Sequence, residues 1–427
     1  MATSSKKTTK NSTSKKSTSK KTSQSINTSA KKYIKKETKK FMKQHKGFST
    51  FLTIFLIIFV GIGGVLYYLG YLDPIIDKYL GNDDNGVQEP IVFDGTVYED
   101  FQVHFLELGN WYAGDSVYIK AGNNDILIDA GSRKSSAETI KNYVDQFCTD
   151  GKLEYVIATH AHQDHIAGFV GTKSGNVRNG IFYSYEVGTL IDFSLTNATS
   201  DIYNEYIEAR DYLISNGTTH YTAKECWNQE NGATRKISLG EDMSFEIVYN
   251  KYYFESSPND ENEYSVCTLF SYKDHHMLFT GDLEEKGEKA LAEYYDGTTL
   301  EKTLPKVELF KAGHHGSPTS SNTCLLKKIQ PKVVCVCCCA GSDEYRQNSA
   351  LDYFPSQSFI DRVAPYTMNV YVTTLSTSNE EKTFSSMNGN ILFSSNGASY
   401  SVACSNNNTL LKDTDWFKNN RNKPSNW

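Results

Sequence analysis

The segment ATHAHQDHIAGF, residues 158–169, places three of the chain's ten histidines and one aspartate within six positions: His160, His162, Asp164 and His165. Neighbouring side chains in such a loop point apart, so the four groups cannot all reach one ion. His160 and His162 can face one ion and Asp164 and His165 another, which suits two divalent metals about 3.5–4 Å apart. Imidazole nitrogen with carboxylate oxygen is a ligand set that favours zinc, with manganese or iron as alternatives. The segment therefore predicts a two-metal site.

Two later segments supply further metal-binding side chains. LFTGDLEE places Asp282 at the end of an apolar run, and FKAGHHGS places His314 and His315 at the end of another. Five of the ten histidines thus lie in two loops that follow strand-like segments, where a sheet can gather ligands from distant parts of the chain. The alternative is a histidine-rich surface loop without a ligand, and this gathering of donors argues against it.

Strand-like and helix-like segments alternate along the chain. The predicted strands are runs of β-branched and aromatic residues that end at turn residues. The predicted helices have apolar residues on one face, and the first begins with Ser135 and Glu138 at the spacing of a capping box. We expect strands over residues 101–108, 116–131, 153–160, 245–250, 267–282, 306–313 and 332–339, and helices over residues 135–147, 201–215 and 285–295. The alternation predicts a layered α/β domain.

These motifs together resemble a known family. H-x-H-x-D-H followed by T-G-D and H-H-G-S resembles the metallo-β-lactamase fold family, and the branch that it resembles most is the extracytoplasmic domain of ComEC-like late-competence DNA-uptake proteins. FLELGNWYAGDSVYI, ILIDAG, NEYSVCTLF and NGNILFSSNG carry the likeness further, over about residues 101–401. The resemblance implies an αββα sandwich and a metal-dependent hydrolase, and it is less specific for the substrate.

The resemblance also implies roles for single residues. The metal ligands that it implies are His160, His162, Asp164, His165, Asp282 and His315. The first two would hold one metal and the next two the other, with Asp282 bridging both. One of His314 and His315 would complete the second metal site, and the other would contact the substrate or a developing oxyanion; with Asp164 they form the implied catalytic set. Asp129 would orient the loop without binding metal.

One ligand that the wider family usually has is missing. Two-metal members carry another histidine between the H-x-H-x-D-H loop and the bridging aspartate. His220 is the only unassigned histidine there apart from His275 and His276, which lie too close to the T-G-D motif. Asn262 or Ser265 occupies the expected position. We therefore expect the first metal to be weakly held or completed by water.

The amino-terminal region differs sharply from the rest. Residues 1–46 contain 15 Lys and one Glu, a formal charge of +14; the whole chain carries −6, which leaves −20 for the remainder. The uncharged segment FLTIFLIIFVGIGGVLYYLGYL, residues 51–72, is long enough to span a membrane. We expect a disordered cytoplasmic tail (1–47), a transmembrane helix (48–72), a stalk (73–91), the folded domain (92–403) and a polar, poorly ordered tail (404–427). The positive-inside rule places the domain outside the cell.

The sequence thus predicts a membrane-anchored, extracytoplasmic metal-dependent hydrolase. A phosphodiesterase is favoured, with nucleic acid or a cell-envelope phosphodiester polymer as substrate. The acidic domain argues against non-specific binding of long polyanions. The alternatives are a non-catalytic binding module with the same fold, and a lactam or lactone hydrolase that uses the same metals.

The run VVCVCCC contains four of the nine cysteines. Because it lies in an apolar strand, we expect these cysteines to pack as small hydrophobic residues. A disulfide from this run to Cys404, Cys267 or Cys324 is the first alternative, and a metal site is the second.

Overall fold

The computed structural model describes residues 91, 93, 95–175, 177–257, 259–345 and 349–427. The basic tail, the apolar span and nearly all of the stalk predicted from the sequence lie outside these ranges. Within them, none of the helices combines the length and the apolar character needed to cross a membrane.

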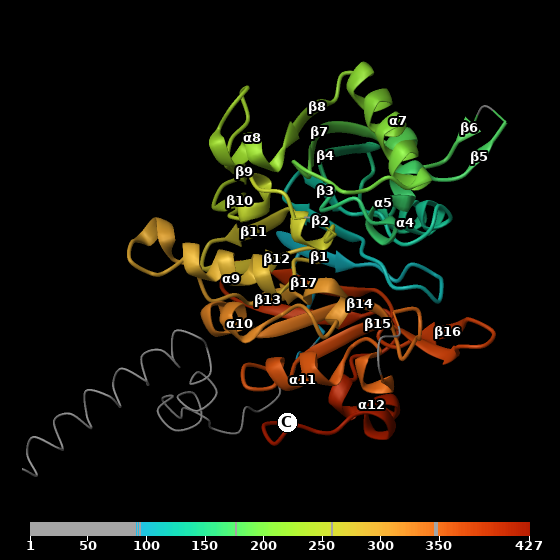
Figure 1. Ribbon diagram of the computed structural model, residues 1–427, viewed down its shortest axis with the longest axis vertical. Coiled ribbons are helices and arrows are strands. Elements are labelled where there is room, and N and C mark those ends of the chain that lie inside the picture. The colour runs from blue at the N-terminus through green and yellow to red at the C-terminus, as the bar shows by residue number, and fades with distance from the viewer. Residues whose placement is uncertain (1–90, 92, 94, 176, 258, 346–348) are drawn as a thin grey trace, which may run out of the picture. The chain divides into compact units, whose positions relative to one another are not determined.

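The first of two large sheets combines strands from the early part of the folded chain with two late strands, β17 and β18, and the histidine motif follows one of its strands (Figure 1). Its strand order is β18 (Tyr400–Cys404), β17 (Ile391–Ser395), β1 (Phe101–Phe105), β2 (Val117–Ala121), β3 (Asn124–Ile128), β4 (Lys152–Ile157), β7 (Glu186–Asp192) and β8 (Thr219–Thr222). The strands from β3 to β8 are parallel and the others antiparallel. A separate small hairpin pairs β5 (Lys173–Ser174) with β6 (Val177–Arg178).

The second sheet is built from the later part of the chain. Its strand order is β16 (Thr383–Ser386), β15 (Val370–Ser378), β14 (Val333–Ala340), β13 (Leu309–Lys311), β12 (His275–Phe279), β11 (Cys267–Tyr272), β10 (Met243–Val248) and β9 (Lys236–Gly240). The strands from β12 to β15 are parallel, so both sheets are mixed.

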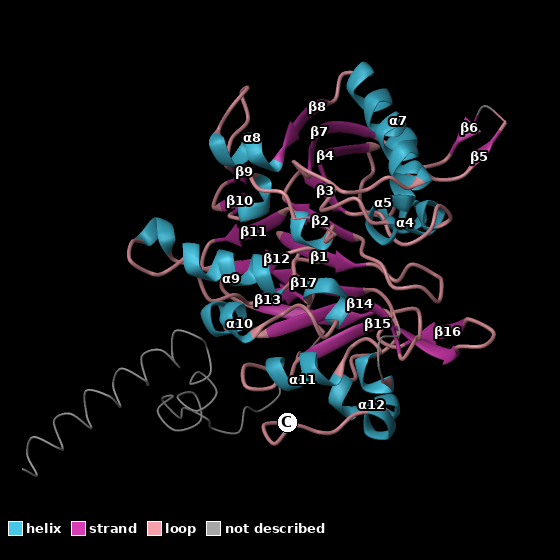
Figure 2. Ribbon diagram, viewed as in Figure 1, coloured by secondary structure: helices cyan, strands magenta, loops and turns pink. Residues whose placement is uncertain are grey.

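Helices pack on the outer faces of the sheets (Figure 2). Those against the first sheet are α4 (Ser136–Val144), α5 (Gln163–Val170), α6 (Ile181–Ser184) and α7 (Asp201–Ser215), and α8 (Ala223–Asn228) lies beyond β8. Those against the second are α9 (Glu285–Tyr294), α10 (Thr323–Ile329), α11 (Gln357–Val363) and α12 (Asp415–Asn420). Short 3-10 helices are η1 (Lys251–Tyr253), η2 (Asn262–Tyr264), η3 (Leu300–Lys302), η4 (Gly313–Gly316), η5 (Ala350–Asp352) and η6 (Leu411–Asp413).

The two sheets meet face to face through aromatic side chains. Phe101 of β1 lies 6.5 Å from Phe270 of β11, between ring centroids, and Phe105 lies 6.3 Å from Phe279 of β12. All four rings are fully buried. The result is an α/β fold of two mixed sheets covered by helices, consistent with the sandwich that the sequence predicts.

The last residues differ from the expectation of a poorly ordered tail. Leu411 and Phe417 are buried in the core of the second sheet. The Arg421 guanidinium is also buried and donates to the carbonyl oxygens of Tyr353 and Pro355. Residues 404–427 are mostly polar, but Leu411, Phe417 and Arg421 hold this segment against the rest of the domain.

Strand β14 explains the cysteine run. Cys335 and Cys337 lie in the core between the sheets, whereas Val334, Val336 and Cys338 lie in the core beneath the helices. Successive side chains of a strand point to opposite faces, and this strand is covered on both, so every position accepts a small apolar residue. The disulfide alternatives are wrong, because all nine cysteines are free thiols.

We therefore expect reductant to leave the melting temperature unchanged. Because no covalent link constrains the unfolded chain, dithiothreitol removes nothing that contributes to stability. A thiol titration of unreduced protein in denaturant should count nine thiols. A count lower by two, together with a melting temperature that falls in reductant, would contradict the packing described for β14.

Candidate metal centre

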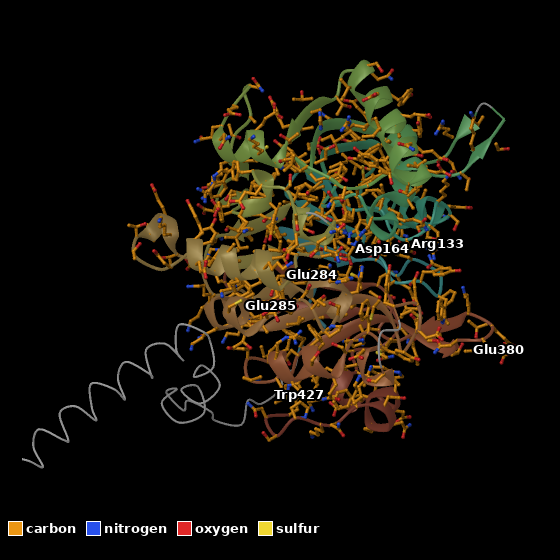
Figure 3. The ribbon with its side chains drawn as sticks, in the orientation of Figure 1. Arg133, Asp164, Glu284, Glu285, Glu380 and Trp427 are labelled. Carbon is orange, nitrogen blue, oxygen red and sulfur yellow. The ribbon has the colours of Figure 1, made fainter. Side chains whose placement is uncertain are left out.

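The ligand-bearing loops all follow strands. Asp129 follows β3, the histidine motif follows β4, Asp282 follows β12 and His315 follows β13. Since β3 and β4 are parallel, as are β12 and β13, each pair places its carboxyl-terminal loops at one edge of its sheet. Asp164 and Glu284, from opposite halves of the domain, both lie in the middle of the molecule (Figure 3).

Four buried side chains converge there: Asp164, His165, Asp282 and His315. Each offers one ligand atom, and these atoms all lie within 4.8 Å of one another. Asp282 Oδ2 is 3.1 Å from His165 Nε2 and 3.2 Å from His315 Nε2. Asp164 Oδ2 is 3.2 Å from His315 Nε2. Two imidazoles and two carboxylates form a ligand set suited to zinc or a similar divalent metal.

The hydrogen bonding of this cluster fits a metal. His165 Nε2 and Asp282 Oδ2 are buried and, despite their proximity, are not aligned for a hydrogen bond to any group. Buried polar atoms without partners are costly, and a cation between them would satisfy both.

The surroundings of both cluster histidines favour the charged, doubly protonated ring. Burial disfavours the charged ring of His165, but the carboxylates of Asp282 and Asp129 outweigh it and raise its pKa well above the usual range. For His315, burial is likewise outweighed by Asp282 and Asp115, which raise its pKa. A metal ligand must be the neutral ring, so metal binding here releases protons.

Each histidine is held so that its Nε2 faces the cluster. Asp129 accepts from His165 Nδ1 at 2.8 Å and from the backbone N–H of Thr159 at 2.8 Å. The carbonyl oxygen of Cys337 accepts from His315 Nδ1 at 3.0 Å. Such partners fix the ring orientation of a metal-binding histidine. Asp129 thus accepts hydrogen bonds both from a candidate ligand and from the backbone of the histidine-motif loop, whose orientation was the role that the resemblance implied for it.

His314 and His315 lie in different surroundings. Only His315 belongs to the four-residue cluster; His314 Nε2 is 3.9 Å from Asp282 Oδ2, and His314 Nδ1 lies 3.1 Å from Glu284 Oε1. Both histidines adopt left-handed backbone conformations, with φ of 45° and 54°. Residues with side chains rarely adopt this conformation.

His160 and His162 lie together but outside that cluster. His160 Nε2 is 3.1 Å from His162 Nδ1. Among the described residues, no group of three His, Cys, Asp or Glu ligands includes either of them. His220 is not the missing ligand, because its Nε2 lies 2.8 Å from the buried Asp192 at the end of β7.

A buried ion pair beneath the cluster was not predicted. The ammonium group of Lys311, only 2% exposed, contacts Asp115 and lies 3.3 Å from Asp282 Oδ1. Asp115 Oδ1 is in turn 3.1 Å from His315 Nδ1. A lysine inside the apolar strand that precedes H-H-G-S was the available signal. Lys311 occupies one oxygen of Asp282 and leaves the other for the cluster.

Tyr345 was also missed, because no local pattern around it marks a contact with the cluster. Its hydroxyl donates to Asp164 Oδ2 at 2.7 Å from the loop after β14. Its ring stacks on Phe354, with centroids 5.3 Å apart. The phenol thus restrains Asp164 through the same oxygen that lies 3.2 Å from His315 Nε2.

The loop after His315 is anchored by Glu288 and Arg362. The buried Glu288 carboxylate accepts from the backbone N–H groups of Ser321 and Asn322 at 2.7 Å each. Arg362 donates to the carbonyl oxygens of Ser320 and Ser321. These contacts fix the segment that positions both histidines of H-H-G-S.

Part of the chain is similar to the metallo-β-lactamase superfamily. A model of that superfamily matches residues 109–173, which include the histidine motif. Distant homology to ComEC-like competence proteins extends over about half the chain. Recombination protein 2 of Haemophilus influenzae is 33% identical over 76 residues, and competence protein ComA of Neisseria gonorrhoeae is 25% identical over 226 residues. These matches cover 18% and 52% of this chain but only 8% and 25% of the relatives.

Solved structures show weaker likeness. The metallo-β-lactamase fold protein YhfI from Bacillus subtilis is 10% identical, and the match covers 64% of this chain and 95% of YhfI with a TM-score of 0.37. CmlA, a diiron beta-hydroxylase from Streptomyces venezuelae, is 11% identical, and the match covers 62% of this chain and 48% of CmlA with a TM-score of 0.30.

We expect Asp129→Asn to weaken zinc binding by about 10–100-fold without unfolding the protein. The amide oxygen can still accept from Thr159, but the amide nitrogen then faces His165 Nδ1, donor against donor. Isothermal titration with zinc measures the change, and Asp145→Asn, an exposed carboxylate far along α4, is the matched control. If both variants bind zinc as tightly as the wild type, Asp129 does not orient a zinc ligand.

Glu288 gives a pH-dependent prediction. Burial raises its pKa to about 7, above the ordinary value of 4.5. Between these values the folded state keeps a proton that the unfolded chain has lost, so stability falls as the pH rises through this window. Relative to Glu288→Gln, the wild type should lose up to about 3 kcal/mol of unfolding free energy from pH 4.5 to 7. Urea melts across that range test this, and parallel pH profiles would refute it.

Proposed function

We propose that this protein is a metal-dependent hydrolase that cleaves phosphodiesters. The carrying observation is the buried cluster of Asp164, His165, Asp282 and His315, in which two unpartnered atoms face each other. A metal bound there supplies a water of lowered pKa and polarises a phosphoryl oxygen. The match of residues 109–173 to the superfamily model supports a hydrolase, and the H-H-G-S motif supports the phosphodiesterase side of that superfamily.

The protein's own residues would bind and orient the substrate. Glu284 fixes His314 through Nδ1, so its Nε2 faces the space beside Asp282. When doubly protonated, this ring can donate to a charged phosphoryl or leaving oxygen. Tyr345 holds Asp164 in place. His314 is thus proposed to contact the substrate, whereas Tyr345 and Glu284 position the groups that do.

Two observations bear on the substrate class, the names of the relatives and the net charge of the domain, and they favour different phosphodiesters. The relatives named for recombination and competence favour a nucleic acid. The formal charge of −20 beyond residue 46 opposes a long polyanion and favours a cell-envelope phosphodiester. We further propose, from the basic tail and apolar span alone, that the chain is anchored in the membrane with this site outside the cell. We also propose that the protein binds two divalent metal ions, and that zinc is the favoured metal.

A second candidate is a binding module that keeps the fold without catalysis. The incomplete ligand set around His160 and His162 favours it, because a single metal need not support hydrolysis. Lactam or lactone hydrolysis is a third chemistry that the same metals could perform.

Hydrolysis of bis(p-nitrophenyl) phosphate by the metal-loaded full-length chain tests the proposal. We expect turnover in the wild type and a loss of at least about 100-fold in Asp282→Asn, because this residue contacts both cluster histidines. Asp413→Asn, an exposed aspartate outside the site, is the control that should retain full activity. His314→Ala should bind metal normally and lose activity.

The alternatives give different results. If the wild-type protein binds metal but does not cleave the phosphodiester, the proposed activity is wrong. Turnover of nitrocefin or a homoserine lactone in its place would indicate the lactam or lactone reaction. If none of the three substrates is turned over, the non-catalytic binding module is the candidate that remains.

A further inference from the structure

Two positively charged side chains gather on one aromatic ring beside the metal centre. The Arg133 guanidinium lies over the Tyr112 ring, with its central carbon 3.3 Å from the ring centroid. The Lys382 ammonium lies 5.2 Å from the same centroid and 3.5 Å from the phenolic oxygen. Arg133 is in the loop between β3 and α4, whereas Lys382 is in the turn between β15 and β16. The two cations therefore come from different sheets and meet on one ring.

The loop that carries Arg133 packs against the segment that carries Asp164 of the metal cluster. The carbonyl oxygen of Ser132 accepts from Arg133 Nη1 at 2.6 Å and from Gln163 Nε2 at 3.2 Å. Gln163 directly precedes Asp164 in sequence. A Cβ atom on Gly114 would lie 2.8 Å from both the carbonyl oxygen of Asp164 and the Cβ of Ser132, so there is no space between the two segments.

A second connection runs through the loop after β14. Arg133 Nη2 lies 3.2 Å from Glu344 Oε1, and Glu344 Oε2 accepts from the backbone N–H of Ala113 at 2.8 Å. The next residue, Tyr345, donates to Asp164 Oδ2. Arg133 and Asp164 accordingly lie next to each other in Figure 3. The guanidinium is thus fixed from two directions at the rim of the centre.

This arrangement leaves positive charge available to a ligand. The Arg133 side chain is 29% exposed, and its two acceptors, Ser132 and Glu344, use two of the five N–H donors of a guanidinium. Glu344 balances one of the two positive charges, and Lys382 is exposed. A hydrogen bond from Arg133, and then Lys382, lower the pKa of the Tyr112 phenol, as a positive field does. Because the chain beyond residue 46 has a formal charge of −20, this pair does not reflect a general excess of cations.

We propose that Arg133 and Lys382 form an anion subsite, which binds a second negatively charged group of the substrate while a phosphodiester lies at the metal centre. The inference rests on the proposed phosphodiester chemistry and narrows its substrate to molecules with a second phosphate close to the cleaved one. A planar guanidinium suits two oxygens of one phosphate, and the lysine adds a point charge on a flexible stem. Tyr112 and Glu344 position the guanidinium.

Binding titrations with paired phosphates test the anion subsite without any turnover. Thymidine phosphorylated on both hydroxyls is compared with thymidine monophosphate, and glycerol bisphosphate with glycerol phosphate, by calorimetry on the full-length chain in the presence of zinc. In at least one pair, the wild type should bind the bisphosphate about tenfold more tightly or more, because hydrogen bonds between charged groups are strong. The pair that shows this gain identifies the spacer between the phosphates as a nucleoside or a polyol.

Two variants and a matched control assign the gain to the subsite. Arg133→Gln should remove most of it, and Lys382→Gln should reduce it by about threefold at low salt and by less at physiological ionic strength. Arg178→Gln should keep the full gain. Arg178 also pairs with a carboxylate, that of Glu208, and lies over a tyrosine ring, that of Tyr183, but it belongs to the separate β5–β6 hairpin.

The results separate this proposal from the proposed activity. Equal affinities for bisphosphate and monophosphate in both pairs would overturn the anion subsite, and so would a gain that neither variant diminishes. Because Lys382 is exposed, Lys382→Gln decides the matter even if Arg133→Gln fails to fold. A wild type that shows the gain but does not cleave bis(p-nitrophenyl) phosphate would refute the proposed activity and support the anion subsite.

Discussion

Four carboxylates meet inside this protein, those of Asp115, Asp129, Asp164 and Asp282, and their mutual repulsion must be balanced where water is excluded. Each is fully buried or nearly so, a state that proteins tolerate only when charges are paired. Lys311 balances part of this charge from below, and His165 and His315 balance part of it from the site itself. A metal adds positive charge at the same point. The orientation of the histidines, the position of the lysine and the need for a cation are consequences of this one concentration of negative charge.

The two-sheet architecture makes the concentration possible. A single loop could supply two or three ligands, but Asp282 and His315 come from the second sheet and must face the motif after β4. The aromatic contacts between the sheets, such as Phe105 with Phe279, fix that distance. Rigid strands bring the loops together, and buried polar groups such as Glu288 then hold the loop that contains the strained histidines. The strands therefore set the positions of the loops, and hydrogen bonds within the loops set the positions of the side chains.

The sequence revealed those parts of the site that are contiguous. The H-x-H-x-D-H loop, the T-G-D aspartate and the H-H-G-S histidines each carry their donors within a few residues at the end of a strand, so their type and spacing were readable. It did not decide between His314 and His315, because that choice depends on two left-handed backbone conformations. It did not reveal Tyr345 or the pairing of Lys311 with Asp115, because these contacts join segments far apart in the chain and carry no local pattern. Composition also misled at the end of the chain, where a few apolar residues outweigh many polar ones.

The two histidines of the centre have a consequence for how it takes up metal. The carboxylates around them favour the charged form of both rings, so protons offset part of the negative charge at the point where a metal would bind. A metal ligand must be the neutral ring, so an incoming ion would have to displace these protons. Metal and protons would therefore compete for the same buried carboxylates, and the acidity of the surroundings would set how fully the centre is loaded.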